Sequence, residues 1–429
     1  MSELRVERYY FGEFEPVGAL SSDDVFELTF TYDEAFCSKA QAAPLSLSLP
    51  LSRHCYDIEE SLPFFEGLLP EGSARESIAR ELHVSPYAPF DLLQALGAEP
   101  IGAIRMGREE DLHRAGAGYT PLTEEDIDQL SKESGLACAR YLKQARLSLA
   151  GAQHKVGLYV HDDPQKGKKY YVPDGVAAST HIIKTGSREF EGIVFNECFC
   201  LSLARACGIA VPDVSLVTAA QPMLAIKRFD RAIDKRCPHY DGLPNPIRLH
   251  QEDFSQALGI ESAKKYEAGD NDFPRLVADL IRAACADPPR DIEALARAMI
   301  FDYLIGNCDN HIKNLSLLYS EDYRTIQLAP FYDVVCTTVY PLDREMGMRI
   351  GSSRLIDQIR RDDFALLGSS LGVGKQRMLR LLDTTSELLA AALDGGVGEA
   401  PLAAGNPDAE SVVEKIAHEA RGRINAIKA

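Results

Sequence analysis

Residues 306–314 read Gly-Asn-Cys-Asp-Asn-His-Ile-Lys-Asn, and residues 331–333 read Phe-Tyr-Asp. Asp309 and Asn314 therefore stand in the order D-x-x-x-x-N, and Asp333 ends a later apolar run. In phosphoryl-transfer enzymes with this order, the first aspartate accepts the proton of the acceptor hydroxyl, while the asparagine and the later aspartate hold Mg²⁺ against the ATP phosphates. The order predicts a catalytic loop with Asp309 as the base and with Asn314 and Asp333 as metal ligands.

The segments around this loop favour the same interpretation. Residues 292–304 have apolar side chains at helical spacing, so a helix should deliver Asp309 to a loop beyond its end. Residues 315–319 and 325–328 form an apparent hairpin directly before Asp333. A lone D-x-x-x-x-N also arises by chance as a polar turn that caps a helix. The hairpin between the two aspartates favours the kinase arrangement over that alternative.

Two more side chains of the loop are candidates. Lys313 is a cation that can neutralise the phosphoryl group during transfer, so we predict a catalytic role for it. For His311 we favour a structural role that braces the loop backbone over metal ligation, because no second histidine lies nearby in the sequence.

A lysine for the ATP phosphates is expected upstream. Lys184 ends the short apolar run 181–184, as the lysine of a V-A-I-K strand does. The helical segment 190–207 follows and offers Glu191 and Glu197 as ion-pair partners, of which Glu197 lies deeper in the helix. The alternative is a solvated lysine at the end of a strand.

Two further segments are candidate nucleotide contacts. Residues 146–155 place small residues and a lysine between a helix and a strand, so that backbone N–H groups can approach phosphates closely. They match neither the Walker A motif nor G-x-G-x-x-G. Residues 224–231 link strands to helices, either as a hinge that contacts adenine or as a charged linker. The residues alone leave both assignments open.

Composition excludes several classes of protein. The 429 residues carry 46 basic and 64 acidic side chains, a net charge of −18, so the chain as a whole repels nucleic acid. No long apolar run or signal peptide is present, which predicts a cytoplasmic protein without a membrane contact. The ten cysteines form no C-x-x-C pair, so we expect reduced thiols and no zinc site.

The coarse organisation is mixed. We predict a strand at 26–32, helices at 73–82 and 90–96, and a polar surface connection at 107–128 whose second half begins a helix at Thr123. Further strands are expected at 155–160, 170–172, 181–184 and 224–227, and further helices at 273–285 and 377–393. The stretch 394–408 is rich in Gly, Ala and Pro, which predicts a mobile loop before a last charged helix.

Taken together, these pieces resemble the HipA family of serine/threonine kinases, the toxin half of HipA–HipB toxin–antitoxin systems. The carriers are residues 148–155, 181–185, 227–231, 307–314 and 331–333, with 44–50 and 64–70 at the N-terminal end. The resemblance implies an α+β, protein-kinase-like bilobal fold. It also implies four parts: an N-terminal subdomain at 1–110, a connector at 111–140, a kinase N-lobe at 141–235 and a helical C-lobe at 236–429.

The resemblance also implies roles for single residues. Asp309 matches the base, Ser148 matches an autophosphorylation site, and phosphate on Ser148 would add about two negative charges to its loop. ATP and Mg²⁺ contacts are implied at Ala150, Gly151, Ala152, Gln153, His154, Lys155, Lys184, Lys227, Phe229, His311, Asn314 and Asp333. The chain departs from the family pattern at His154, where glutamate is more usual, and at Lys227, where the hinge often starts with glutamate.

The function implied is an ATP- and Mg²⁺-dependent protein serine/threonine kinase that acts as a toxin. Family members phosphorylate aminoacyl-tRNA synthetases, which inhibits translation and induces dormancy. The implied partner is a HipB-like helix-turn-helix antitoxin, through which alone the chain would meet DNA. Two alternatives are a co-repressor subunit with weak or lost kinase activity and a small-molecule phosphotransferase. The N-terminal 110 residues and the Ser148 loop argue against the phosphotransferase.

Overall fold

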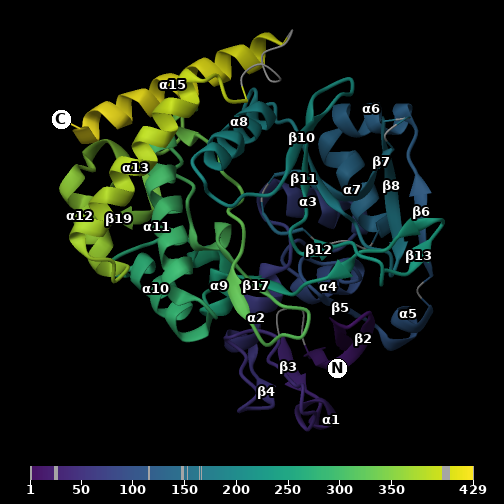
Figure 1. Cartoon of the computed structure of the whole chain (residues 1–429). Helices are drawn as coiled ribbons and strands as arrows, with labels where there is room; N and C mark the ends of the chain where they lie inside the picture. Colours follow the sequence, from purple (N-terminus) through teal and green to yellow (C-terminus); the bar gives the residue numbers. More distant parts are fainter. Residues whose placement is uncertain are drawn as a thin grey trace. The chain divides into compact units, whose positions relative to one another are not determined.

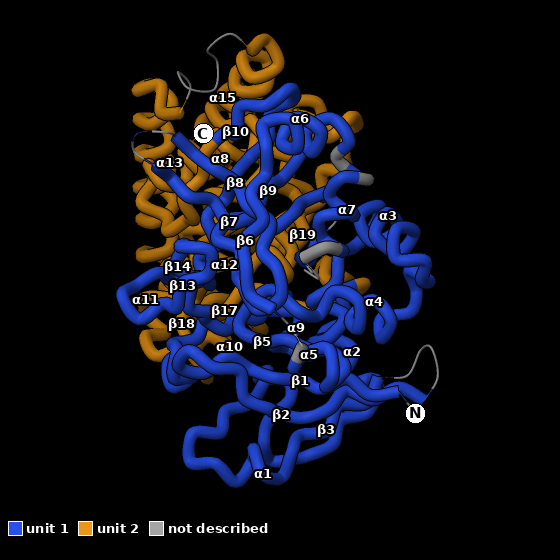
Figure 2. Tube along the Cα trace, turned by 90° about the vertical axis from the view of Figure 1, so that its right-hand side faces the viewer, with its two compact units in different colours: residues 1–185, 216–262, 318–325 blue, residues 186–215, 263–317, 326–429 orange. Residues whose placement is uncertain are grey.

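The computed structural model describes residues 2–23, 28–114, 116–145, 149–151, 153–163, 165, 167–398 and 406–428. The chain forms two compact units (Figure 2). Unit 1 comprises Met1–Thr185, Leu216–Ser262 and Leu318–Thr325, and unit 2 comprises Gly186–Ser215, Ala263–Leu317 and Ile326–Ala429. Each unit therefore draws on segments that are far apart in the sequence. The four-part division by sequence stays a prediction.

The first sheet of unit 1 is antiparallel, with the strand order β4-β3-β2-β1-β5, of which Figure 2 labels β3, β2, β1 and β5. Its strands are β1 (Ser2–Tyr10), β2 (Glu13–Ser22), β3 (Thr29–Tyr32), β4 (Cys55–Tyr56) and β5 (Ile104–Gly107). The strand predicted at 26–32 is confirmed over Thr29–Tyr32; Leu28 precedes the strand, and residues 24–27 lie outside the described part of the chain.

Helices accompany this sheet in the same unit. They are α1 (Glu34–Cys37), α2 (Ile58–Gly67), α3 (Gly72–Leu82) and α4 (Pro89–Leu96). The predicted helices at 73–82 and 90–96 are thereby confirmed to within one residue. Asp57 begins α2 with a capping box, in which its side chain and that of Glu60 each accept a backbone N–H of the other.

The second sheet has the order β10-β11-β9-β7-β8-β6, and the pairs from β11 to β6 are antiparallel. Its strands are β6 (Ala117–Pro121), β7 (Lys155–Asp163), β8 (Gly167–Gly175), β9 (His181–Thr185), β10 (Val214–Val217) and β11 (Met223–Lys227). The four predicted strands are confirmed, each somewhat longer than its apolar run. Helix α7 (Ser134–Ala145) packs on β7, β8 and α3, and most of the buried apolar residues of both sheets form one core.

The segment 107–128 is a correction to the sequence analysis. It is not only a surface connection, because it contains α5 (Glu109–Arg114) and β6, an edge strand paired with β8. Tyr119 is its buried anchor, with its ring centroid 4.5 Å from that of Tyr159. A single buried apolar residue produces no alternation of apolar and polar residues, so the sequence did not indicate a strand here. The helix predicted from Thr123 is confirmed as α6 (Glu124–Lys132), capped by Thr123 and Asp126.

Unit 2 is mainly helical (Figure 1). Its long helices are α8 (Ile193–Ala206), α10 (Phe273–Ala284), α11 (Pro288–Ile305), α12 (Arg361–Ser370), α13 (Lys375–Asp394) and α15 (Pro407–Lys428), and its sheet contains β19 (Glu345–Ile350) and β20 (Ser353–Leu355). The predicted helices at 190–207, 273–285, 292–304 and 377–393 are confirmed. Strands β17 (Ser316–Tyr319) and β18 (Ile326–Leu328) form where the hairpin was expected.

The predicted mobile loop at 394–408 stays a prediction, because residues 399–405 lie outside the described part of the chain. Over the described residues, no helix has the length and apolar character needed to cross a membrane.

A buried carboxylate joins the N-terminal part of unit 1 to a later segment of the same unit. Glu252, in β16 (Gln251–Asp253), is fully buried and accepts hydrogen bonds from Ser46 Oγ, from the Leu47 backbone N–H at 3.1 Å and from Tyr319 Oη. No cation is among these partners, and burial raises the pKa of Glu252 to about 7.

This pKa predicts a pH-dependent stability. Between its ordinary pKa near 4.5 and about 7, folded Glu252 keeps a proton that the unfolded chain releases. The stabilisation is complete at low pH and is lost as the pH rises through 7. The difference in unfolding free energy between wild type and Glu252→Gln should therefore shift by on the order of 3 kcal/mol between pH 5 and pH 8, as measured by urea unfolding. The exposed Glu59→Gln is the control, and an equal pH profile for wild type and Glu252→Gln would contradict the assignment.

Candidate active site

The predicted catalytic loop begins where α11 ends. Gly306 terminates the helix with φ of 81°, a left-handed conformation that favours glycine. Its carbonyl accepts backbone N–H groups from Thr337 at 3.0 Å and Thr338 at 3.2 Å. The Thr337 hydroxyl in turn accepts the Cys308 N–H at 2.8 Å. The chain therefore turns after α11, and hydrogen bonds with Thr337 and Thr338 hold the residues on either side of Asn307.

A buried aspartate supports the loop from inside α11. Asn307 Nδ2 donates to Asp302 Oδ1 at 2.7 Å, and Asn307 Oδ1 accepts the backbone N–H of Asp309 at 3.1 Å. Burial, with the nearby charge of Asp309, holds the pKa of Asp302 well above its usual range. Sequence reasoning missed Asp302 and Asn307, although an acidic residue on the apolar face of a helix was a signal that could have found them.

The side chain of Asp309 is half exposed, at 50%. Its Oδ1 accepts a hydrogen bond of 2.6 Å from Tyr266 Oη and lies 3.7 Å from His311 Nε2. His311 is buried, and its backbone N–H donates to the Asp309 carbonyl at 2.9 Å. Asp309 is thus oriented by neighbours while its carboxylate remains open to solvent, as a base for an incoming hydroxyl requires.

Asn314 belongs to the same loop, and Asp333 follows a tyrosine that is hydrogen-bonded to it. Asn314 Nδ2 donates to the Asp309 carbonyl at 2.8 Å, which leaves the amide oxygen as the group suited to a hard cation. Tyr332 Oη donates to the Lys313 carbonyl at 2.8 Å and lies 2.7 Å from Ser316 Oγ. Tyr332, which sequence reasoning did not single out, therefore ties the residue before Asp333 to the loop.

The two predicted ligands, Asn314 and Asp333, would suit a cation that keeps most of its ligands as water or phosphate. Among the described residues no group of three His, Cys, Asp or Glu side chains could hold a metal by itself. One amide and one carboxylate are the partial set typical of Mg²⁺ bound together with a nucleotide.

Removing the Tyr332 hydroxyl should loosen this part of unit 2. Tyr332→Phe leaves the Lys313 carbonyl without its donor, so we expect a loss of about 1–2 kcal/mol in local stability. Hydrogen exchange measured by mass spectrometry should show faster exchange in peptides covering 312–316 and unchanged exchange in α15, the internal control. Equal protection of 312–316 in both proteins would contradict the role of the hydroxyl.

The residues that are predicted to contact the ATP phosphates lie in unit 1. Lys155 in β7 and Lys184 in β9 are directly paired in the antiparallel register, so their side chains lie on the same face of the sheet. Both are buried, with 9% and 4% of their surface exposed. The phosphate contacts predicted for these two lysines stay a prediction.

The loop before Lys155 is held by contacts with neighbouring segments of unit 1. Gly151 has φ of 102°, and a Cβ there would lie 2.8 Å from Lys155 Nζ, so the ammonium group packs against the glycine. The Gly151 carbonyl accepts the Glu71 N–H at 3.0 Å. Gln153 Nε2 donates to the Thr185 carbonyl at 3.1 Å. Ser148 and Ala152 lie outside the described residues, so their predicted roles are not addressed.

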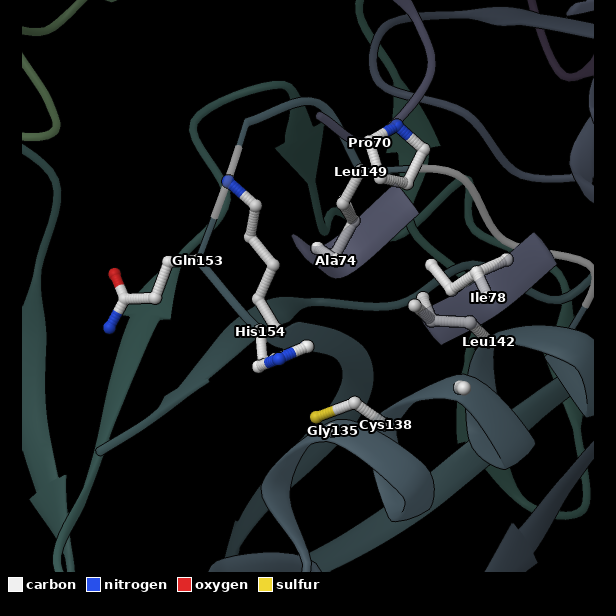
Figure 3. Close-up of a pocket in the computed structure, with 11 residues that line it drawn as sticks. Pro70, Ala74, Ile78, Gly135, Cys138, Leu142, Leu149, Gln153 and His154 are labelled. Atoms are coloured by element: carbon white, nitrogen blue, oxygen red, sulfur yellow. The ribbon is translucent and has the colours of Figure 1, made fainter. Parts of the chain in front are cut away.

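His154 lies against helix α7 and lines a small hollow, which Figure 3 shows together with side chains of α3 and α7. A Cβ on Gly135 would lie 3.3 Å from the imidazole of His154. Burial lowers the pKa of His154 and favours its neutral form. The substitution of the usual glutamate thus places a neutral ring, and no carboxylate, beside the loop.

The predicted hinge contains a buried ion network that sequence reasoning missed. Lys227 is exposed and Phe229 is half-buried, whereas Arg228, Asp230 and Arg231 between and after them are buried. The network joins these three side chains to Glu99 and Arg248. Glu99 stands 129 residues before Arg228, which is why the segment resembles a charged linker in the sequence.

The candidate residues therefore form two groups. Unit 1 holds the described members of the phosphate loop, Lys184 and the hinge, and unit 2 holds Asp309, His311, Lys313, Asn314 and Asp333. Glu197 is buried in α8 of unit 2, so its ion pair with Lys184 of unit 1 stays a prediction.

The fold that carries these groups is of the α+β kinase-like class. Family models match at residues 10–107, the HipA N-terminal domain, and at residues 147–393, the HipA-like C-terminal domain. The chain belongs to the HipA family of kinases.

Relatives and a solved structure agree with this assignment. A Sinorhizobium fredii protein named "Putative kinase Y4mE" is 36% identical over 394 residues, which cover 88% of this chain and 90% of the relative. The serine/threonine-protein kinase toxin HipA of Shewanella oneidensis is 27% identical and is matched over 85% of this chain and 83% of its own length. A chain in the solved complex of Shewanella oneidensis HipA, HipB and operator DNA has a TM-score of 0.79 at 23% identity, with 98% and 97% of the two chains covered.

Proposed function

We propose that this chain is an ATP- and Mg²⁺-dependent protein serine/threonine kinase that acts as the toxin of a HipA–HipB-type pair in the cytoplasm. The observation that carries the proposal is the loop after α11. There the carboxylate of Asp309 is half exposed and braced from Asn307, while Asn314 is bonded to the Asp309 carbonyl.

The proposed roles divide between the two units. In unit 2, Asp309 accepts the proton of a seryl or threonyl hydroxyl, and Lys313 offsets charge on the phosphoryl group. Asn314 and Asp333 would hold Mg²⁺, which with ATP supplies the phosphoryl group and neutralises its charge. In unit 1, the opposed Lys155 and Lys184 would bind phosphates.

The hinge completes the nucleotide side of the proposal. Lys227 and Phe229 flank Arg228, whose backbone N–H is bonded to the Thr180 carbonyl at 2.9 Å. The buried network around Arg228 and Asp230 holds this backbone, so the hinge can present fixed groups to adenine.

The partner and substrate follow from the family. The Shewanella HipA chain was solved with HipB and operator DNA, and we propose a HipB-like helix-turn-helix antitoxin here. The net charge of −18 suits a basic partner and disfavours direct DNA binding, so DNA is met through the antitoxin. The proposed substrate is an aminoacyl-tRNA synthetase, and the proposed control is autophosphorylation of Ser148. A match to the HipA N-terminal domain over 10–107 favours this function over a small-molecule phosphotransferase.

Incubation of the full chain with Mg²⁺ and γ-labelled ATP tests the proposal. We expect label on the chain itself, located at Ser148 by peptide mapping and absent in Ser148→Ala. Ser46→Ala is unsuitable as a control because Ser46 supports Glu252, whereas Ser369→Ala removes an exposed hydroxyl of α12. The proposed function would be contradicted if neither the wild-type chain nor an added synthetase became labelled.

A further inference from the structure

A hydroxyl group of the chain itself already contacts the predicted base. Tyr266 Oη donates the 2.6 Å hydrogen bond to Asp309 Oδ1. The Tyr266 ring lies edge-on to His311, with ring centroids 5.0 Å apart and planes at 81°. Tyr266 is 43% exposed, so this contact is open to solvent. A hydroxyl bonded to the carboxylate is the arrangement that a substrate adopts on a general base.

One glycine connects the backbone near Tyr266 to the catalytic loop. The N–H of Gly347, in β19, donates to the Cys308 carbonyl at 2.8 Å. The carbonyl of Gly347 accepts the N–H of Glu267, the residue after Tyr266, also at 2.8 Å. A Cβ at position 347 would lie 2.8 Å from the His311 backbone nitrogen, so only glycine allows this approach.

A second contact fixes the same backbone. The Glu267 carboxylate is fully buried and accepts the Arg349 backbone N–H at 2.6 Å and a further hydrogen bond from Arg349 Nε. Arg349 Nη2 also donates to the Gly269 carbonyl at 2.8 Å. Tyr266 is therefore attached to a backbone that β19 holds firmly, and its hydroxyl reaches Asp309 from a fixed position.

We propose that Tyr266 occupies the place of the acceptor hydroxyl on Asp309 and that a substrate hydroxyl must displace it. The inference rests on the proposed function, in which Asp309 is the base. An acceptor is then used only if the residues around its hydroxyl make contacts that compensate for the lost bond. Segments of a protein substrate can supply such contacts, whereas water and small alcohols cannot. Tyr266 is thus a specificity-determining residue that favours protein acceptors over hydrolysis of ATP.

Tyr266→Phe tests the inference, because it removes the hydroxyl and keeps the ring on His311. With dephosphorylated casein as the acceptor probe, we expect the KM for casein to fall about tenfold, the equivalent of about 1.4 kcal/mol, with kcat unchanged. ATP hydrolysis without casein should rise by a similar factor, while the KM for ATP stays constant. Tyr87→Phe, a change at an exposed tyrosine in unit 1, is the matched control. Tyr266→Leu is a second variant without the hydroxyl.

The outcomes separate the two proposals. If the wild-type chain transfers phosphate to casein or to itself, and the variants leave KM and hydrolysis unchanged or lower kcat, the role of Tyr266 is overturned and the proposed function stands. Phosphate found on Tyr266 itself would also overturn displacement, since the phenol would then be an acceptor. If the folded wild-type chain transfers no phosphate at all, the proposed function fails, and this inference fails with it.

Discussion

Replacement of Asp309 by asparagine is expected to lower phosphoryl transfer about 10²- to 10⁴-fold, the range that a positioned general base contributes. Asparagine has nearly the same shape and can still accept the Tyr266 hydrogen bond, so the loop should keep its geometry. It cannot accept the proton of the attacking hydroxyl. The measurement is the rate of transfer from γ-labelled ATP, with the thermal midpoint of each protein as a test of folding.

The matched control for this prediction is Asp362→Asn in α12. Asp362 lies in the same unit, and its side chain is almost entirely exposed, so its loss should not change the rate. Phosphoryl transfer by Asp309→Asn within a few-fold of wild type would show that another group serves as the base. Asn314 and Asp333 would then also have to be reassigned, because their role as metal ligands assumes that Asp309 is the base.

Replacement of Asp230 by alanine is expected to destabilise unit 1 by about 3–5 kcal/mol, the cost of breaking a buried ion pair from one side. Asp230 accepts Arg228 Nε at 2.9 Å, Arg228 Nη2 at 2.8 Å, Gln251 Nε2 at 3.0 Å and the Gly102 N–H at 2.8 Å. Its neighbouring arginines hold its pKa well below the usual range despite burial. Without it, Arg228 and Arg231 would depend on Glu99 alone for negative charge.

The measurement is urea unfolding of wild type and Asp230→Ala, compared at equal slope of free energy against denaturant. Asp234→Ala is the control. Asp234 also pairs with an arginine, Arg236, but both side chains are solvent-exposed, and exposed pairs contribute little. A change in stability by Asp230→Ala as small as that of the control would show that the network is not needed for the fold of unit 1.

Local patterns predicted most of the secondary structure. The helical spacing of 73–82 and 292–304 and the short apolar runs before Lys184 and Lys227 correspond to elements that form. Such patterns succeed because helix and strand periods are properties of neighbouring residues. The edge strand β6 was missed, since Tyr119 is its single buried apolar anchor and an edge strand requires little more.

Contacts between distant residues were beyond the sequence. The pairing of Lys155 with Lys184 depends on the register of β7 and β9, and a register is set by the whole sheet. Tyr266 stands 43 residues before Asp309, and no spacing rule relates a tyrosine to a base at that separation.

By itself, the sequence determined the order D-x-x-x-x-N and the helix that leads to it. Both are formed by residues that lie close together in the sequence. The tertiary structure alone decided what surrounds them: the Tyr266 hydroxyl on Asp309, the Gly347 backbone between them, and the buried charges behind the hinge. Those neighbours are selected by burial and hydrogen bonding across long separations, where every polar group taken from water must find a partner.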